Sequence, residues 1–532
     1  MKVQRSPSVK QEFGNAVMKS EEPQSSEYHP NSHTVESDGG YDMAALHELG
    51  SIIARTMPNI PLLDEMGVID MRAITLSLAS GIHTEVRYAL DSLVVISRDD
   101  RIHFELGHCE DLMDVIVDCA EEQVDLLAEE AAEVSDALDL LSYEDVMRGS
   151  RAEADTLQDV PEYGTTAYEL NRAADKVIAI TTIMRNFSFF EHNHALLTSS
   201  PVVKWLSNTL RLLGTRNMLL RTLHNTLDFY KDIIVFLSNI TQSLELPTRD
   251  DALHVLHFLL AFAPQPAPSF DESDDSGRVR FAPFNPAIHR YLPPAVDCLA
   301  KLLARQDPNR QLYRSLFNPS SSSSHSDADS PLDLLTKAFA LSISVLPDRT
   351  SKGSLGNAHQ LRIVEARKAY LCQGMLAADI LAALAPGNDT ALARAWTESE
   401  DGWLVSLVHL ASVLSVVRPG AEVAKAGLVR GELGQDTETF KLITHRSLSI
   451  IKRLSEKAGK GVMSRAFVNG VNGSAREEDE DGDGEGRGGE VKAAPKWEGI
   501  PHVQTVMGAA LMANTEKVAL GQLLELHYMA MQ

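Results

Sequence analysis

The residues that could carry chemistry in this chain of 532 residues are few and scattered. It contains no G-x-S-x-G nucleophile elbow, no phosphate-binding loop ending in G-K-[ST] and no H-E-x-x-H zinc motif. A run of glycines between positions 482 and 489 stands among acidic residues, which repel a phosphate group rather than hold one. We therefore predict no catalytic residue and no cofactor, and we expect that the protein is not an enzyme.

Two pairs of histidines come nearest to a metal site. His192 and His194 lie two positions apart beside Glu191, and His254 and His257 share one helical face. Structural and catalytic zinc sites draw three or four ligands from the protein, and neither pair has a wider ligand cluster around it. The spacing favours a capping turn for the first pair and the edge of the core for the second. No metal site is predicted.

Acidic residues concentrate in two segments of a chain whose formal net charge is −25. Residues 109–159 hold 17 acids and two arginines, and residues 476–490 hold eight acids and two arginines. At 100° per residue, residues 112–141 place apolar side chains on one side and carboxylates on the other, which predicts a helix over this range. Its acidic face is a candidate docking surface for a basic segment such as a histone tail or a subunit arm, and the alternative is a solvated face. The candidate residues are Asp114, Asp118, Glu121 and Asp125.

A second candidate docking region is the phenylalanine-rich segment 185–190. Phe187, Phe189 and Phe190 are more aromatic residues than one helix face needs. The alternative is that they fill the core of a helical repeat. The mildly basic stretch from Lys204 to Lys231 has its cations on different helical faces and no interleaved aromatic ladder, so direct nucleic-acid binding is not expected from it.

The elements that must position these residues are helices almost everywhere. Apolar residues recur with a period of 3.6, and regular strand alternation bounded by turn residues is hard to find. The period predicts helices within residues 177–190, 202–213, 230–243, 250–262, 295–304, 332–342, 367–384, 404–414 and 440–457.

A recurring unit, in which an apolar helix ends in an Asn-containing turn, suggests repeats. Asn186 and Asn239 hold equivalent places 53 residues apart and are predicted to bond to backbone at a bend. The predicted fold is all-α, an armadillo/HEAT-like α-solenoid of degenerate repeats, with a generic helical bundle as the alternative.

Low-complexity segments divide the chain. We predict a disordered tail at 1–40, a helical repeat domain at 41–468, an acidic glycine-rich loop at 469–495 and a C-terminal helical segment at 496–532. Flexible loops are expected within the repeat domain near 264–280, 319–331, 347–358 and 419–437. With four scattered cysteines, no apolar signal segment and no run long enough to span a membrane, we expect a soluble intracellular protein without disulfides and without membrane contact.

Six blocks in order resemble the C-terminal region of the fungal ARID-bearing subunit of the SWI/SNF chromatin-remodelling complex. The likeness extends over roughly residues 41–457. The blocks are Ile60–Ser97, Cys109–Leu127, Ile180–Leu197, Thr215–Ile240, His289–Arg310 and Ala366–Gly387.

This resemblance implies an armadillo-like region without catalytic residues, in a nuclear protein that contacts other subunits of a remodeller, including its ATPase, and acts in transcription regulation. Only about 40 residues precede the region of likeness at 41–457, too few for the DNA-binding ARID domain. DNA contact of that type is therefore not expected from this chain. The alternative function is a free α-solenoid adaptor for transport or signalling.

Overall fold

The computed structural model describes residues 43–56, 61–99, 101–109, 111–156, 160–270, 279–318, 329–347, 357–387, 391–399, 401–416, 432–458 and 517–531. Every regular element in these ranges is a helix, and the β-contact found there is an isolated bridge between Glu133 and Arg216. The predicted all-α class is confirmed for this part of the chain. The predicted tail at 1–40 and acidic loop at 469–495 lie outside the described residues. None of the helices described is long and apolar enough to cross a membrane.

The helices fall into two compact units, Met1–Leu62 and Leu63–Gln532. The first contributes α1 (Met43–Thr56), and the second contributes all later elements. These are α2 (Met71–Ala79), α3 (His83–Arg98), α4 (Leu112–Glu130), α5 (Tyr143–Ala154), α6 (Thr166–Phe187), α7 (His194–Leu197), α8 (Ser200–Thr215), α9 (Leu223–Ile240), α10 (Arg249–Leu260), α11 (Leu292–Ala304), α12 (Asn309–Leu316), α13 (Pro331–Ile343), α14 (Asn357–Leu384), α15 (Ala391–Thr397), α16 (Trp403–Val416), α17 (Glu432–Ala458) and α20 (Lys517–Met531). Short 3-10 turns lie at Leu63–Glu65, Leu106–His108 and Glu191–Asn193.

Several helices of the second unit begin at a serine or threonine whose hydroxyl accepts a hydrogen bond from a backbone N–H of the first turn. Such caps supply a partner to N–H groups that have no helical acceptor. At α10 the cap is reciprocal, because the Asp251 carboxylate also accepts from the Thr248 backbone N–H at 3.1 Å. The other caps of this kind are Ser142 for α5, Thr165 for α6, Thr222 for α9 and Ser330 for α13.

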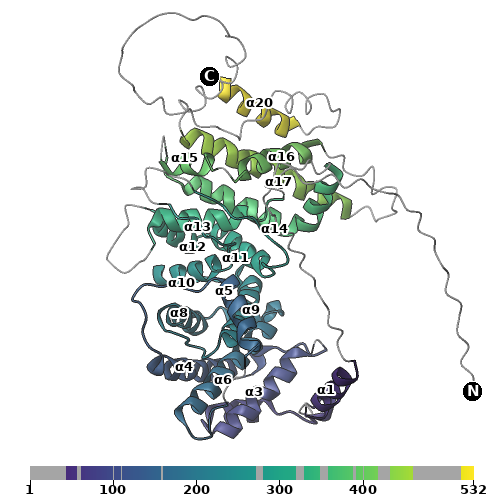
Figure 1. Cartoon of the computed structure of the whole chain (residues 1–532), viewed down its shortest axis with the longest axis vertical. Coiled ribbons are helices and arrows are strands. Elements are labelled where there is room, and N and C mark those ends of the chain that lie inside the picture. Colours follow the sequence, from purple (N-terminus) through teal and green to yellow (C-terminus); the bar gives the residue numbers. More distant parts are fainter. Residues whose placement is uncertain are drawn as a thin grey trace, which may run out of the picture. The chain divides into compact units, whose positions relative to one another are not determined.

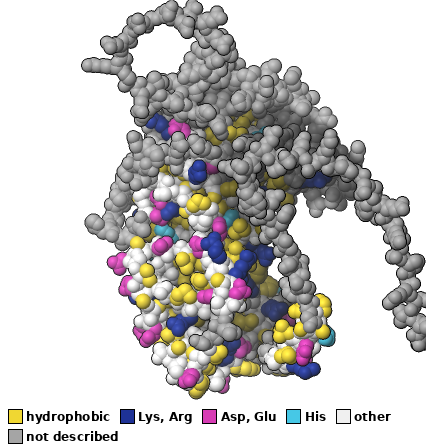
Figure 2. Space-filling model, viewed as in Figure 1, with side chains coloured by type: hydrophobic (Ala, Val, Ile, Leu, Met, Phe, Trp, Pro, Cys, Tyr) yellow, Lys and Arg dark blue, Asp and Glu magenta, His cyan; other side chains and the backbone are white. Residues whose placement is uncertain are grey.

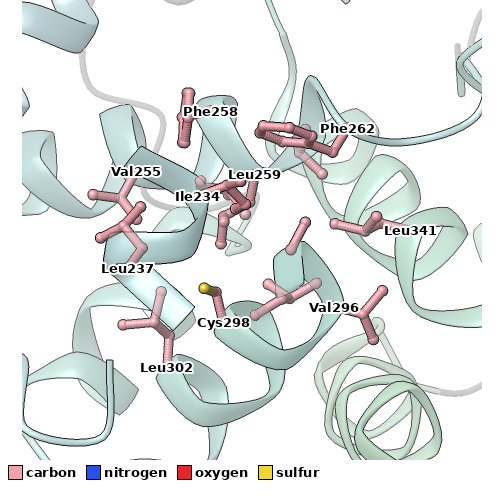
Figure 3. Close-up of a cluster of buried hydrophobic side chains, with 14 of the residues drawn as sticks. Ile234, Leu237, Val255, Phe258, Leu259, Phe262, Val296, Cys298, Leu302 and Leu341 are labelled. Atoms are coloured by element: carbon pink, nitrogen blue, oxygen red, sulfur yellow. The ribbon is translucent and has the colours of Figure 1, made fainter. Parts of the chain in front are cut away.

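The core is built from the apolar faces that these helices turn toward one another. Figure 3 shows one part of it, where side chains of α9, α10 and α11 meet, among them Leu237, Phe258 and Cys298. Burial raises the pKa of the Cys298 thiol to about 12, so this cysteine packs as a small apolar group. Leu237, Phe258 and Cys298 are each at most 1% exposed.

Within the second unit, a series of helices contact one another in chain order. α3 packs on α6, α6 on α9, α9 on α11, α11 on α14 and α14 on α17. Other helices fill in beside this series: α4 packs on α6 and α8, α10 on α8 and α12, and α13 on α14. Figure 1 shows the series running through the colours of the chain, from violet α3 to green α17. The second unit is thus a succession of packed helices.

One predicted helix is shorter in the structure than its sequence pattern indicates. The period over 112–141 predicts one helix, but α4 ends at Glu130. The following segment runs extended beside the end of α8, where the Val134 N–H donates to the Thr215 carbonyl at 2.9 Å and the Asp139 N–H to the Gly214 carbonyl at 3.2 Å. Val134 is consequently 70% exposed rather than part of the predicted core face. This pairing with a distant segment satisfies backbone groups that a continued helix would have satisfied locally.

Candidate partner-docking surface

The acidic surface lies on α4, whose opposite face is buried. Leu112, Ile116, Ala120, Val124 and Leu127 are at most 1% exposed, and they hold the helix against its neighbours. Because Cβ positions repeat every three to four residues along a helix, the carboxylates spaced at 114, 118, 121 and 125 share the outer face. All four predicted side chains, Asp114, Asp118, Glu121 and Asp125, are exposed.

These four carboxylates have no ion-pair partner among the described residues. Elsewhere in the same region acids are paired: Arg72 lies 3.5 Å from Asp111 and Arg216 lies 3.3 Å from Glu133. A row of like charges on one helix face is mutually repulsive, and a cationic partner relieves that repulsion. The α4 carboxylates are therefore accessible, and their charge is not neutralised by the rest of the described chain.

The three phenylalanines expected to share a docking region occupy three different environments. Phe187 is fully buried and stacks on Phe104 with ring centroids 4.9 Å apart. Phe190 is half-buried, with its ring edge-on to His103 at 5.7 Å. Phe189 is 63% exposed. Phe187 therefore belongs to the core, as the alternative interpretation has it, and the accessible aromatic surface here is that of Phe189.

A buried polar network holds the end of α6 against α9 beneath this segment. The Asp232 carboxylate, 5% exposed, accepts hydrogen bonds from Thr182 at 2.6 Å and Thr181 at 3.3 Å, and it pairs with the Arg185 guanidinium. Burial raises the pKa of Asp232, and the hydrogen bonds and the nearby arginine oppose that rise. The network fixes where the phenylalanine-rich segment emerges from α6.

The asparagines predicted to sit at repeat bends lie instead near the ends of helices α6 and α9. The Asn186 amide donates to the Ser97 hydroxyl at 3.0 Å, and the Asn239 amide donates to the Ser188 hydroxyl at 2.9 Å. Asn186 thus bonds to a side chain of α3, and Asn239 bonds to the side chain of Ser188, the residue that caps the end of α6. Neither amide bonds to backbone at its own bend. What the two asparagines share is that each links its helix to the preceding helix of the series.

The histidines at 192 and 194 bond to main-chain carbonyls in the turn after α6. His192 Nε2 lies 3.0 Å from the Phe104 carbonyl oxygen, and His194 Nε2 lies 2.8 Å from that of Ser188. Farther along the chain, His254 Nδ1 lies 2.8 Å from the Ser207 hydroxyl. These contacts give the rings structural partners, in agreement with the capping interpretation. Within the described ranges no three His, Cys, Asp or Glu side chains form a metal-binding group.

Most cations of the mildly basic stretch from Lys204 to Lys231 are engaged with partners of the chain itself. Lys231 pairs with Asp228 at 3.0 Å, and Arg216 is paired with Glu133 as described above. Arg211 donates to an Asn208 side chain and Arg221 to that of Asn171. These bonds point the cations to different neighbours, so they form no shared phosphate-binding track.

Two buried asparagines that sequence reasoning did not single out form matching clamps. The Asn193 side chain accepts from the Leu106 N–H at 2.9 Å and donates to the Phe104 carbonyl at 2.9 Å. The Asn309 side chain accepts from the Leu246 N–H at 2.9 Å and donates to the Leu244 carbonyl at 3.0 Å. Both clamped segments have the sequence apolar-Glu-Leu, and both asparagines follow the carboxyl end of an apolar helix. These two shared sequence features could have identified Asn193 and Asn309 from the sequence alone.

Comparison with known proteins adds the last observation. No family model matches the chain. The SWI/SNF chromatin-remodeling complex subunit sol1 of Schizosaccharomyces pombe is 27% identical over 463 residues, which cover 82% of this chain and 50% of sol1. The SWI/SNF chromatin-remodeling complex subunit SWI1 of Saccharomyces cerevisiae is 29% identical over 146 residues, 27% of this chain and 11% of SWI1. The match with sol1 thus covers most of this chain but only half the length of sol1. It is homologous to the fungal SWI/SNF chromatin-remodelling subunits sol1 and SWI1.

Proposed function

We propose that this protein is a non-catalytic scaffold subunit of a SWI/SNF-type ATP-dependent chromatin-remodelling complex. The observation that carries the proposal is the similarity to sol1 over 82% of the chain, because sol1 is named as a subunit of that complex. On this proposal the protein acts in the nucleus, in transcription regulation, and its partners are the other subunits, among them the ATPase. Its own contribution is binding, since no phosphate-binding loop occurs in its sequence.

An armadillo-like α-solenoid is the architecture that we propose for the second unit. The packing of α3, α6, α9, α11, α14 and α17 in chain order supports it, since in a solenoid each repeat contacts chiefly its neighbours. The paired clamps of Asn193 and Asn309 support it as well, because the same local device recurs at two positions of the series, after α6 and after α11. Such a stack presents long surfaces to several partner chains at once.

The assembly contacts are proposed to include the α4 carboxylates and the exposed ring of Phe189. A basic protein segment, such as a histone tail or an arm of another subunit, has the complementary charge for Asp114, Asp118, Glu121 and Asp125. Phe189 offers an exposed aromatic side chain of the kind that anchors protein interfaces. Phe190, half-buried, borders it.

Affinity purification of the tagged full chain from nuclei of its own host tests the proposal. We expect a remodelling ATPase and further subunits of the same complex to co-purify through stringent washing, with the chain in the nuclear fraction. Recovery of the chain without any such ATPase would contradict the proposal. A cytoplasmic pool bound to transport cargo or signalling proteins would favour the free adaptor instead.

A further inference from the structure

A small groove lies where α12, α14 and α17 meet, away from the acidic helix. Its volume is about 230 Å³, below the range of pockets that take whole cofactors or drug-sized ligands. A groove of this size suits one or two side chains of a peptide. Three arginines line it, Arg310 and Arg314 from α12 and Arg453 from α17, together with a single carboxylate, Asp379 of α14.

The guanidinium groups around this groove have donors to spare. Arg453 uses its Nε, which lies 3.2 Å from the Asp379 carboxylate and 3.1 Å from the Ser449 hydroxyl. Arg310 donates to the Ala304 carbonyl at 3.3 Å. Arg314, which is exposed, makes no hydrogen bond or ion pair with any residue that the structure describes. Each guanidinium carries five N–H donors in a fork that matches the two oxygens of a carboxylate.

The remaining lining residues are Leu303, Tyr313, Ile380, Ala383 and Leu384. Leu303 and Tyr313 are buried, so the accessible surface here is the aliphatic surface of Ile380, Ala383 and Leu384. A ligand that fits both halves carries anionic oxygens beside an apolar group. A nucleic-acid strand fits less well, because the accessible aliphatic side chains Ile380 and Leu384 offer no flat surface on which bases stack.

We propose that this groove binds an acidic peptide segment of a partner protein. Its carboxylates pair with Arg310 and Arg314, and a neighbouring aliphatic side chain packs against Ile380 and Leu384. The proposal does not rest on membership of a remodelling complex, because the groove is argued from its own residues.

The test measures binding of a fluorescein-labelled peptide in which leucines alternate with pairs of glutamates, by anisotropy, to the purified full chain. We expect saturable binding that the double variant Arg310→Gln/Arg314→Gln weakens by about tenfold or more, because the variant removes both guanidinium groups that pair with the peptide carboxylates. Both arginines are exposed, so the variant is expected to retain the parent's thermal melting temperature. The matched control is Arg148→Gln on α5, which removes an exposed charge from a helix that does not line the groove. We expect the affinity of this control variant to be unchanged.

Two further peptides test the two halves of the proposal. Replacing the glutamates by glutamines, or the leucines by serines, is expected to reduce the affinity. Equal binding to the parent and to Arg310→Gln/Arg314→Gln would overturn the assignment, as would undiminished binding of the glutamine peptide. Displacement of the peptide by a single-stranded oligonucleotide at lower concentration than by unlabelled peptide would overturn it in favour of a nucleic-acid groove.

Discussion

Two buried tyrosines differ in what their hydroxyl groups contact. Tyr230 on α9 donates to the Leu141 carbonyl at 2.8 Å, and it thereby holds the extended segment that follows α4. Tyr313 on α12 is equally buried, but its hydroxyl has no hydrogen-bond partner among the described residues. Burial raises the pKa of both phenols, so both stay neutral over the pH range in which proteins fold.

Replacing each tyrosine by phenylalanine is expected to change the stability of the fold differently. Tyr230→Phe removes one bond and leaves the Leu141 carbonyl without its donor, so it lowers the free energy of unfolding by about 1–2 kcal/mol. Tyr313→Phe removes a hydroxyl that is desolvated without compensation, so it leaves stability unchanged or raises it by up to about 1 kcal/mol. Urea denaturation followed by circular dichroism measures both, and an equal loss in the two variants would contradict the difference.

The Asp232 carboxyl makes stability depend on pH in a defined direction. Burial raises its pKa in the folded chain above the unfolded value, which is about 4. The folded state therefore holds this proton more tightly, and the resulting stabilisation is present at low pH and lost as pH rises through the folded pKa. Asp232→Asn removes this dependence. We expect the difference in unfolding free energy between parent and variant to shift in the parent's favour as the pH falls from neutral to the unfolded pKa of about 4.

Urea titrations of parent and Asp232→Asn at those two pH values check the expectation. The exposed Asp91, which pairs with Arg87 at 3.0 Å on the surface of α3, gives the control variant Asp91→Asn. A shift in the opposite direction for Asp232→Asn, or the same shift in the control, would count against a raised pKa at position 232.

At the scale of elements, helix ends in this fold are held by side chains from elsewhere. Lys301 on α11 donates to the Ser238 carbonyl near the end of α9 at 3.0 Å, and Lys457 on α17 donates to the Ala382 and Ala383 carbonyls near the end of α14 at 2.8 Å each. Cations at these places also interact favourably with the partial negative charge of a helix carboxyl end. At these two contacts between successive helices, the carboxyl ends of α9 and α14 are therefore held by charge-assisted hydrogen bonds.

The two asparagine clamps should be among the costliest polar positions to remove. Asn309→Ala leaves both the Leu246 N–H and the Leu244 carbonyl without their partner, so we expect it to lower the free energy of unfolding by about 2–4 kcal/mol. Asn193→Ala leaves the Leu106 N–H without its partner, whereas the Phe104 carbonyl keeps the His192 ring at 3.0 Å, so we expect a smaller loss of about 1–3 kcal/mol.

Asn208→Ala is the matched control, since Asn208 makes a single bond to an exposed arginine on the same helix. Its expected effect is below about 0.5 kcal/mol. Thermal melting of the three variants makes the comparison, and clamp variants as stable as the Asn208 variant would show that the clamps contribute little.

The hydrophobic period of the sequence predicted most helices well. It failed where a contact with a distant part of the chain sets the end of a helix or the burial of a side chain. The segment 202–213 carries a full 3.6 period and lies within α8, and the segment 250–262 matches α10 but extends two residues past its end at Leu260. The period also continues past Glu130, yet α4 stops there because the next residues pair with the end of α8, some 80 residues away in the chain. The exposure of the α4 acids followed from the same period, whereas the separation of Phe187 from Phe189 depends on Phe104, which no spacing rule connects to them.

At the scale of the whole molecule, acidic and basic side chains are mixed over most of the described surface that Figure 2 shows, with two local concentrations of charge. On the face drawn in Figure 2, acidic, basic and apolar side chains are interspersed, so no single sign of charge covers it. The α4 acids and the α12 arginines are concentrated exceptions of opposite sign. Surfaces of opposite charge favour partners of opposite charge, a basic partner at the α4 acids and an acidic partner at the α12 arginines.

Charge reversal on α4 tests the first of these surfaces in the assembled state. The variant with Lys at Asp114, Asp118, Glu121 and Asp125 is expected to lose a basic partner from the purified complex at moderate salt while the chain remains folded, because all four side chains are exposed. The control places Lys at the exposed and dispersed acids Asp155, Glu162, Asp250 and Glu456, which changes the net charge equally. Unchanged complex composition in the α4 variant would mean that this face is only solvated.

The asparagine clamps also bear on the order in which the chain is made. Asn193 lies 87 residues after the Leu106 N–H that it satisfies, and Asn309 lies 63 residues after that of Leu246. As a ribosome adds residues one by one, each apolar-Glu-Leu segment leaves the exit tunnel long before its asparagine exists. A nascent chain that stops between segment and clamp therefore has unpaired backbone groups beside its apolar helices, and it is then a substrate for chaperones until the clamp residue emerges.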